Sequence, residues 1–296
     1  MGAAIQLLVF FLGCGASSPN PLAATATLLR LGLDPEREAD ALEESLVAAG
    51  LRRRLRIDGR THSSLWMVRP GTSEAVVRVV TRAGIALGVD APEQTGGRAV
   101  GLLDLHGDVD GDGHEEIGVF ADDPARDRRC IAVLRVDAQG RVHEVRLDTR
   151  SLQGDACIEA FEDIDGDGRV EALVVARYPE LSVGTPPRVA VPFRTRGWRP
   201  LRDGPARAFA RAQRLRREVG LRAAREQADA HAAYRLGVEL AGLARLAGEG
   251  SEAQVAALRS AVAGLELTAG LAAAVEEAAA FIRRGWRAAD DPALPP

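Results

Sequence analysis

The stretch DVDGDGHEE, from Asp108 to Glu116, occurs a second time as DIDGDGRVE, from Asp163 to Glu171. In both copies acidic residues occupy positions 1, 3, 5 and 9, and glycine occupies positions 4 and 6. A hard cation such as Ca²⁺ takes about six to eight oxygen ligands, and alternating carboxylates can turn toward a common centre. The glycines permit the positive φ angles that let a backbone curl around an ion. The repeated stretch therefore predicts two calcium loops.

The predicted ligands follow one pattern in both loops: carboxylates at positions 1, 3 and 5, a backbone carbonyl at position 7 and a closing carboxylate at position 9. They are Asp108, Asp110, Asp112, His114 and Glu116 in the first loop, and Asp163, Asp165, Asp167, Arg169 and Glu171 in the second. An EF-hand would carry its closing glutamate at position 12, where this chain has Val119 and Val174. The alternative to a metal site is an Asp/Gly-rich turn without an ion. Two copies in register favour the metal, because clustered carboxylates repel one another unless a cation relieves the repulsion.

Short β-branched or alternating segments surround the two loops. The predicted strands lie at 51–57, 64–68, 75–80, 85–89, 99–106, 116–121, 130–136, 142–147, 156–162, 170–178 and 188–201, with Gly-, Pro- and Asp-rich turns between them. Aligning Asp108 with Asp163 superposes strand, acidic loop, strand, turn and strand, at an offset of 55 residues (163 − 108). Such an offset indicates an internal repeat, and residues 51–89 are a candidate third copy without a metal loop.

Acidic loops of the form DxDGDGxxE between strands, recurring at this period, resemble FG-GAP or VCBS-type repeats, the family that includes the calcium-bearing blades of integrin α-subunit propellers. The resemblance covers residues 98–200 and implies β-propeller blades, Ca²⁺ held in the hairpin between strands, extracellular display, and adhesion or ligand binding. Two clear copies cannot close a propeller, which needs at least about four blades. Glu116 and Glu171 also stand where the family more often has Asp, and the FG and GAP motifs are not visible. We therefore expect antiparallel β-hairpin repeats, as a partial propeller or a small β-sheet domain.

The fold class expected for the whole chain is mixed, β then α, because an all-α helical bundle follows the strands. Residues 204–290 are rich in Ala, Arg, Leu and Glu and predict three to five antiparallel helices, with breaks near Gly220 and Gly248–Gly250. Ser251 and Gln254 have the spacing of a capping box. One face of the last helix is apolar and comprises Leu271, Val275, Ala279, Ile282 and Trp286.

A short helix precedes the strands. Asp34 is its predicted N-cap, Pro35 its first residue, and Gly50 its C-terminal stop. Its apolar stripe is formed by Ala39, Leu42, Leu46 and Val47.

The N-terminus predicts export. The run MGAAIQLLVFFL has the length of a signal-peptide core, and FLGC, ending at Cys14, resembles the lipobox of a bacterial lipoprotein. The alternative is a buried N-terminal element with an incidental cysteine. If Cys14 carries lipid, Cys130 and Cys157 remain as an even pair in an oxidising compartment, which predicts a disulfide, with two free thiols as the alternative. The expected segments are a signal peptide (1–13), a lipidated tether (14–35), a β-rich domain (36–203), a helical domain (204–290) and a tail (291–296).

The remaining composition argues against several functions. A small net negative charge of −4 argues against a dedicated nucleic-acid binder, which would carry an excess of positive charge. The histidines form no HExxH pair, and GxSxG, P-loop and dinucleotide motifs are missing. The favoured hypothesis is a non-enzymatic lipoprotein of the bacterial cell envelope with calcium as cofactor, attached to the membrane by its N-terminal lipid. It would act in binding, adhesion or envelope organisation toward an unknown protein or surface ligand. The alternatives are an enzyme or accessory subunit of unrecognised type and a helical interaction scaffold.

Overall fold

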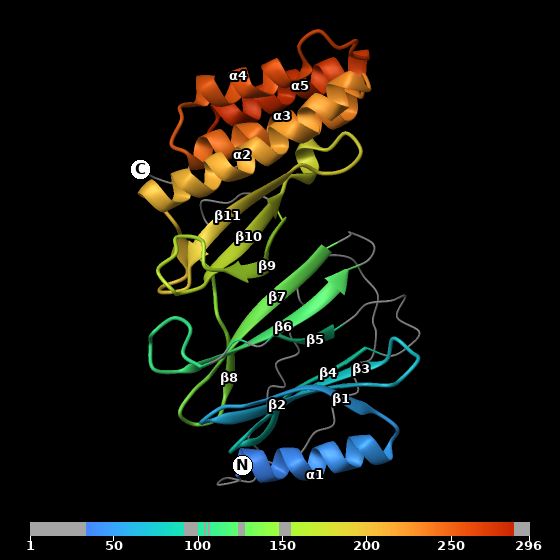
Figure 1. Ribbon diagram of the computed structural model, residues 1–296, viewed down its shortest axis with the longest axis vertical. Coiled ribbons are helices and arrows are strands. Elements are labelled where there is room, and N and C mark those ends of the chain that lie inside the picture. Colours follow the sequence, from blue (N-terminus) through green and yellow to red (C-terminus); the bar gives the residue numbers. More distant parts are fainter. Residues whose placement is uncertain are drawn as a thin grey trace, which may run out of the picture. The chain divides into compact units, whose positions relative to one another are not determined.

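The computed structural model describes residues 34–91, 100–103, 105, 107–123, 128–147 and 155–286. These residues form twelve strands followed by four helices, with one further helix at the start and no closed barrel among them, which confirms the predicted β then α class (Figure 1). The predicted signal peptide (1–13) and Cys14 lie outside the described residues. Two compact units contain the described chain: the first comprises residues up to 107 together with 114–145, and the second comprises 108–113 together with residues from 146 onward.

The first unit begins with α1 (Pro35–Ala48), whose start and end the sequence predicts correctly. The Asp34 side chain caps the helix by accepting a hydrogen bond from the Glu36 N–H at 3.1 Å. Gly50 follows the helix with φ of 89°, a left-handed conformation that glycine adopts without steric cost. Ala39 is buried as predicted, and Leu42 and Leu46 pack against buried residues of the sheet, but Val47 is 52% exposed.

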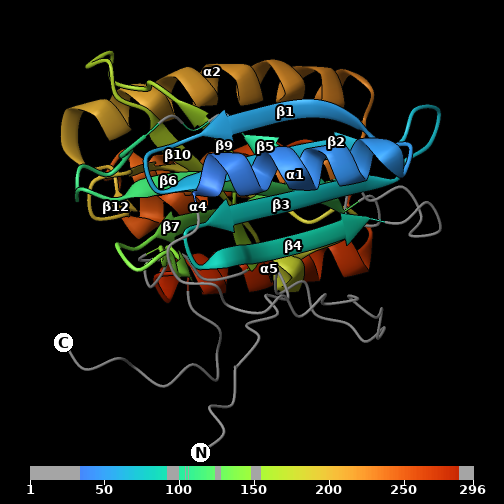
Figure 2. The same cartoon turned by 90° about the horizontal axis from the view of Figure 1, so that it is seen from below.

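Strands β1 (Arg52–Asp58), β2 (His62–Val68), β3 (Ala75–Thr81) and β4 (Gly84–Ala91) form an antiparallel meander in the order β1-β2-β3-β4. The helix α1 lies along one face of this sheet, as Figure 2 shows, and packs against β2 and β3. Val76 and Val80 of β3 point to the helix side, whereas Val77 and Val79 join the core on the other face. The strand is buried on both faces, and its valines therefore do not alternate with polar residues; Arg78, at its centre, is partly exposed.

Strands β5 (Val100–Leu103), β6 (Glu115–Asp123), β7 (Arg128–Val136) and β8 (Val142–Glu144) form a second antiparallel meander in the same unit. Its apolar face packs against the first meander in one core. That core contains Ile57, Ala75, Val77, Val79, Val100, Leu102, Ile117, Val119, Leu134 and Val136. The first unit is therefore two four-stranded meanders face to face, with α1 on the outer face of one.

The second unit contains a third meander, formed by β9 (Asp155–Glu162), β10 (Glu171–Arg177), β11 (Arg188–Arg194) and β12 (Arg199–Pro200). Both metal-loop copies are thus flanked by the same succession of four strands, and residues 52–91 form a four-stranded meander without an acidic loop. Cys130 and Cys157 form the predicted disulfide bond.

The helices α2 (Asp203–Glu226), α3 (Ala230–Leu246), α4 (Ser251–Val262) and α5 (Ala269–Arg283) complete the second unit. α3 packs directly on β11, where a Cβ on Gly242 would come within 2.5 Å of Val189. Buried Glu239 of α3 accepts a hydrogen bond from the Arg188 N–H at 3.1 Å and lies 2.6 Å from Nε of Arg217 on α2. Leu271, Val275, Ala279, Ile282 and Trp286 are all buried, as the pattern predicts.

Two details of the predicted helices are wrong. α2 continues through Gly220 because it packs along α3 and a single glycine costs a helix only about 1 kcal/mol. No capping box forms at Ser251, because Gly250 is the N-cap and Ser251 is already the first helical residue. Gln254 instead donates to the Glu249 carbonyl at 2.6 Å and accepts from the Trp286 indole at 2.8 Å. None of the helices in the described ranges combines the length and apolarity needed to cross a membrane.

Candidate metal centres

The two acidic loops occupy equivalent places in two meanders. The first loop joins β5 to β6, and the second joins β9 to β10. In each case the closing glutamate belongs to the second of the two strands, so the sheet fixes one end of the site while the aspartates lie in the turn. The predicted placement between antiparallel strands is confirmed.

Both loops share three hydrogen bonds, two of them to the first aspartate. Asp108 accepts from the backbone N–H groups of Gly111 at 2.7 Å and Gly113 at 2.8 Å. Asp163 accepts from Gly166 at 2.7 Å and from Gly168 at 3.0 Å, in the same order of oxygens. The first aspartate therefore gathers the loop's amides around its carboxylate.

The aspartate at position 3 also accepts the same hydrogen bond in both loops. Asp110 accepts from the Asp112 N–H at 3.1 Å, and Asp165 accepts from the Asp167 N–H at 3.3 Å. All four loop glycines have positive φ, between 75° and 92°. These angles explain the glycines at positions 4 and 6, because a side chain there would be strained. Two segments 55 residues apart (163 − 108) thus share three hydrogen bonds and the left-handed conformation of their glycines.

Carboxylate oxygens converge in both loops. In the first, Asp108, Asp110, Asp112 and Glu116 each offer an oxygen within 4.8 Å of the others. In the second, Asp163, Asp165 and Glu171 do so. Asp167 is not in this set and accepts a hydrogen bond from the Arg169 N–H at 2.8 Å. Four of the predicted carboxylates meet in the first loop and three in the second.

The closing glutamates are buried in different surroundings. Glu116 is 1% exposed, and Nε of Arg135 lies 3.7 Å from its Oε1. Glu171 accepts from the Ile164 N–H at 2.8 Å. Burial raises the pKa of Glu171, the Ile164 N–H opposes this, and the negative charges of Asp165, Asp167 and Asp163 raise the pKa further. The second loop therefore holds carboxylates that repel one another.

The donor set determines which metals suit these loops. Each converging group consists of Asp and Glu alone, without His or Cys. Carboxylate oxygens suit hard cations such as Ca²⁺, Mg²⁺ and Mn²⁺, whereas Zn²⁺ and Cu²⁺ prefer nitrogen and sulfur. His114 and Arg169 remain predicted to contribute their backbone carbonyls. The acidic clusters could hold a metal ion.

Trp198 is a residue of the first loop's surroundings that sequence reasoning missed. It lies in the turn between β11 and β12, is 4% exposed, and donates its indole N–H to Oδ2 of Asp110 at 2.8 Å. Its backbone has φ of 49°, a strained conformation for a residue with a side chain. Trp198 and Asp110 are 88 residues apart, so no local pattern could have paired them.

Glu115, next to the closing Glu116, serves the first unit instead of the metal loop. Its carboxylate accepts hydrogen bonds from the backbone N–H groups of Arg60 at 2.9 Å and Thr61 at 3.0 Å. Burial raises the pKa of Glu115, but these bonds outweigh it and lower the pKa overall. The neighbouring His62 is 3% exposed, and burial lowers its pKa. A carboxylate of β6 thus holds the turn between β1 and β2 through hydrogen bonds from the turn's backbone.

In comparisons with known proteins, no protein-family model, no curated protein and no solved structure matched the chain.

Proposed function

We propose that the chain is a non-enzymatic calcium-binding lipoprotein of the bacterial cell envelope, whose FG-GAP-like hairpins act in binding, adhesion or envelope organisation. The observation that carries the proposal is the repeated loop. Two segments 55 residues apart share three hydrogen bonds, and each gathers three or four carboxylate oxygens within 4.8 Å. Without a bound cation, the repulsion among these carboxylates would destabilise both copies of the loop.

Calcium is the ion that the loops favour. Mg²⁺ demands near-ideal octahedral geometry and releases its waters reluctantly, whereas Ca²⁺ accepts irregular sets of carboxylates and carbonyls. Extracellular calcium modules bind with a Kd of about 10⁻⁴ to 10⁻³ M, a range that is filled outside the cell and not in the cytoplasm. This agrees with the predicted signal peptide and with the disulfide between Cys130 and Cys157.

The first loop should bind more tightly than the second. It gathers four carboxylates rather than three, and two of them, Asp110 and Glu116, are buried. Affinity in calcium loops rises with the number of charged ligands and with the rigidity of the site. The Trp198 indole adds rigidity by holding Asp110 in place.

Isothermal titration calorimetry of the full chain with CaCl₂ tests the metal. The expected result is saturable binding at two sites of unequal affinity, which the double substitution Asp110→Ala and Asp165→Ala abolishes. Glu277→Gln is the matched control, because Glu277 is an exposed acidic residue on α5, outside both clusters. Absence of calcium heat in the wild-type chain would refute the proposal.

The envelope location and the binding role need separate tests. A Cys14→Ala variant should leave the membrane fraction, and its continued partition with membranes would contradict the lipid anchor. Capture of an envelope partner should require calcium if the hairpins carry the binding surface. Capture that persists in a chelator would assign the contact to the helices instead.

A further inference from the structure

Two large apolar side chains of α2 are exposed to solvent. Leu215 and Val219 are each 66% exposed, more than any other large apolar side chain in the described part of the chain. They lie four residues apart and therefore on neighbouring turns of one helix face. Single exposed apolar residues are ordinary on protein surfaces, whereas contiguous apolar groups mark interaction sites. This face of α2 is therefore a candidate contact surface.

The exposed pair belongs to a longer stripe on the same helix. Its five members are all exposed and follow one another at intervals of three or four residues: they are Ala208, Ala212, Leu215, Val219 and Ala223. This spacing places them on one face of the helix, over about 23 Å at 1.5 Å per residue, until Glu226 ends the helix. On the opposite face, Ala206 and Ala224 are buried in the second unit. The helix is thus apolar on two sides, and the described chain covers one of them.

Arginines border this stripe on both sides. They are Arg211, Arg216 and Arg222, each three or four residues from a large apolar member of the stripe. All three are exposed, and none forms an ion pair with a described residue. Arg214 of the same helix differs, because it pairs with Glu218 at 2.9 Å and balances that negative charge. The exposed face is therefore apolar along its middle and positive along its edges.

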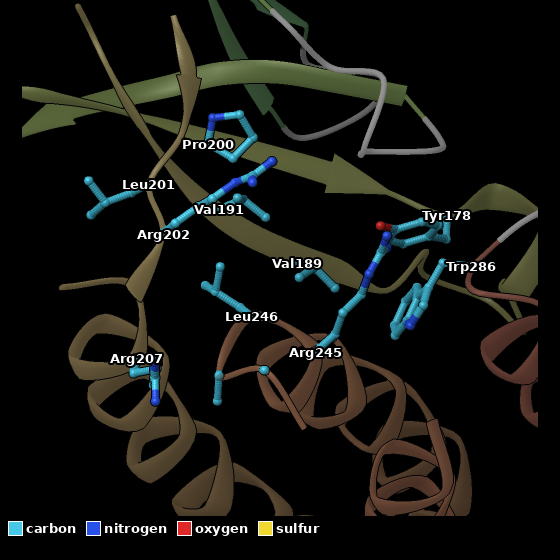
Figure 3. Close-up of a pocket in the computed structure, with 13 residues that line it drawn as sticks. Tyr178, Val189, Val191, Pro200, Leu201, Arg202, Arg207, Arg245, Leu246 and Trp286 are labelled. Atoms are coloured by element: carbon cyan, nitrogen blue, oxygen red, sulfur yellow. The ribbon is translucent and has the colours of Figure 1, made fainter. Parts of the chain in front are cut away.

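The arginines at the start of α2 are not part of this face. Figure 3 shows Arg202 and Arg207 there, beside a cavity of about 430 Å³ that Arg245 and Trp286 also line. The contact surface begins after Arg207 and extends to Ala223.

This pattern fits an anionic lipid surface better than a protein partner. Each side of a stable protein interface contributes about 20 to 30 residues, with aromatic anchors among them. The face of α2 offers five apolar and three basic residues, and none is aromatic. A lipid surface requires no matching shape, accepts apolar side chains below its phosphates, and leaves those phosphates within reach of long arginine side chains. Guanidinium groups also bind phosphate through paired hydrogen bonds.

We propose that this face of α2 lies on an anionic lipid membrane, with its two large apolar side chains in the apolar layer and the three bordering arginines at the lipid phosphates. The helix lies along the surface, because its opposite face stays packed in the second unit. The contact requires neither calcium nor lipid at Cys14. It therefore stands or falls separately from the proposed function.

Fluorescence of a Leu215→Trp variant tests the contact at the helix itself. The full chain, also carrying Cys14→Ala, is mixed in EDTA with vesicles of phosphatidylglycerol and phosphatidylcholine in equal amounts. The introduced indole should shift its emission to shorter wavelength as it leaves water, and the shift should saturate. Vesicles of phosphatidylcholine alone should give no shift, and about 1 M NaCl, where the Debye length is about 3 Å, should suppress it. Val219→Trp replaces Leu215→Trp if the latter does not fold.

The position control is Ala273→Trp, which places an indole at an exposed position of α5, off this face. Its emission should not change with either vesicle. Both tryptophan variants should keep the melting temperature of the parent chain within a few degrees, because the replaced side chains are exposed.

Removal of charge gives the magnitude. An arginine near an anionic membrane contributes about fivefold to binding, so Arg211→Gln, Arg216→Gln and Arg222→Gln together should weaken vesicle binding about 100-fold. The matched control removes the same charge from exposed positions of the first unit that form no ion pair with a described residue: Arg52→Gln, Arg54→Gln and Arg82→Gln. This control should leave vesicle binding unchanged.

Four outcomes would each overturn the proposal. They are no emission shift on phosphatidylglycerol vesicles, an equal shift on phosphatidylcholine alone, an equal shift of Ala273→Trp, and equal weakening by the arginine control.

Discussion

Replacing Asp110 by Asn should reduce the increase in thermal stability that calcium gives. The substitution removes one negative charge from the first loop but leaves a single side-chain oxygen, so only one of the hydrogen bonds from the Asp112 N–H and the Trp198 indole can be kept. At 4.8 Å in water each carboxylate pair repels by about 0.9 kcal/mol. Asp110 belongs to three such pairs, but Asp108 and Asp112 are exposed and salt screens them. Relief of this repulsion, about 1 kcal/mol, opposes the loss of one hydrogen bond, about 1 to 3 kcal/mol, so the variant should be no more stable than the wild type in a chelator.

Calcium should stabilise the wild type more than the variant. With a Kd near 10⁻⁴ M, 10 mM CaCl₂ stabilises a folded protein by about 2.7 kcal/mol per site. This corresponds to a rise in melting temperature of about 5 to 10 °C. Loss of one carboxylate ligand should weaken the first site at least about tenfold, which removes about 1.4 kcal/mol of that gain, or about 3 to 6 °C.

The assay is circular dichroism melting of the wild type, Asp110→Asn and the control Glu277→Gln, each in EDTA and in 10 mM CaCl₂. The two curves of Asp110→Asn should lie closer together than those of the wild type, whereas Glu277→Gln should match the wild type in its calcium response. If calcium raises the melting temperature of Asp110→Asn as much as that of the wild type, the carboxylates of this loop are not its ligands. An unchanged wild-type melting temperature would remove both sites from consideration.

Three further outcomes are expected. Burial raises the pKa of Asp137, but hydrogen bonds from Arg141, His143 and Gln139 lower it well below its usual range. Asp137→Asn should therefore lower the free energy of unfolding by about 1 to 2 kcal/mol at pH 7. Since the folded-state pKa is the lower one, this difference should be complete above about pH 4 and disappear as the pH falls toward the folded value, which denaturant titrations at pH 7 and pH 3 would measure. Trp198→Phe should lower the free energy of unfolding in EDTA by about 1 to 3 kcal/mol, because a buried loop carboxylate loses its indole donor. The control Trp66→Phe removes an indole that makes no hydrogen bond to a described residue, so an equal loss would contradict this account. Gly101→Ala should destabilise the chain by about 1 to 3 kcal/mol in urea unfolding, because the added Cβ would lie 2.5 Å from a neighbouring aromatic ring; wild-type stability would show that this core yields.

The strands were predictable because their signals are local. All twelve fall within or beside the predicted segments, since β-branched runs between Gly-, Pro- and Asp-rich turns leave few other conformations. The ends of the helices were less predictable from the sequence. Gly220 predicts a helix break, but α2 continues past it because α2 packs on α3. Ser251 and Gln254 fit a local capping rule, yet Gln254 forms its bonds with Glu249 and with Trp286, 32 residues away.

For the acidic loops, the sequence by itself determined the spacing of the carboxylates and the turn conformation, because these depend on residues within nine positions of one another. Only the tertiary structure decided that Trp198 holds Asp110, and that three arginines and Trp286 surround one cavity. Such groupings arise when distant segments pack together. The sequence carries no periodic or spacing signal for them, because only the packing of whole strands and helices brings these side chains within reach.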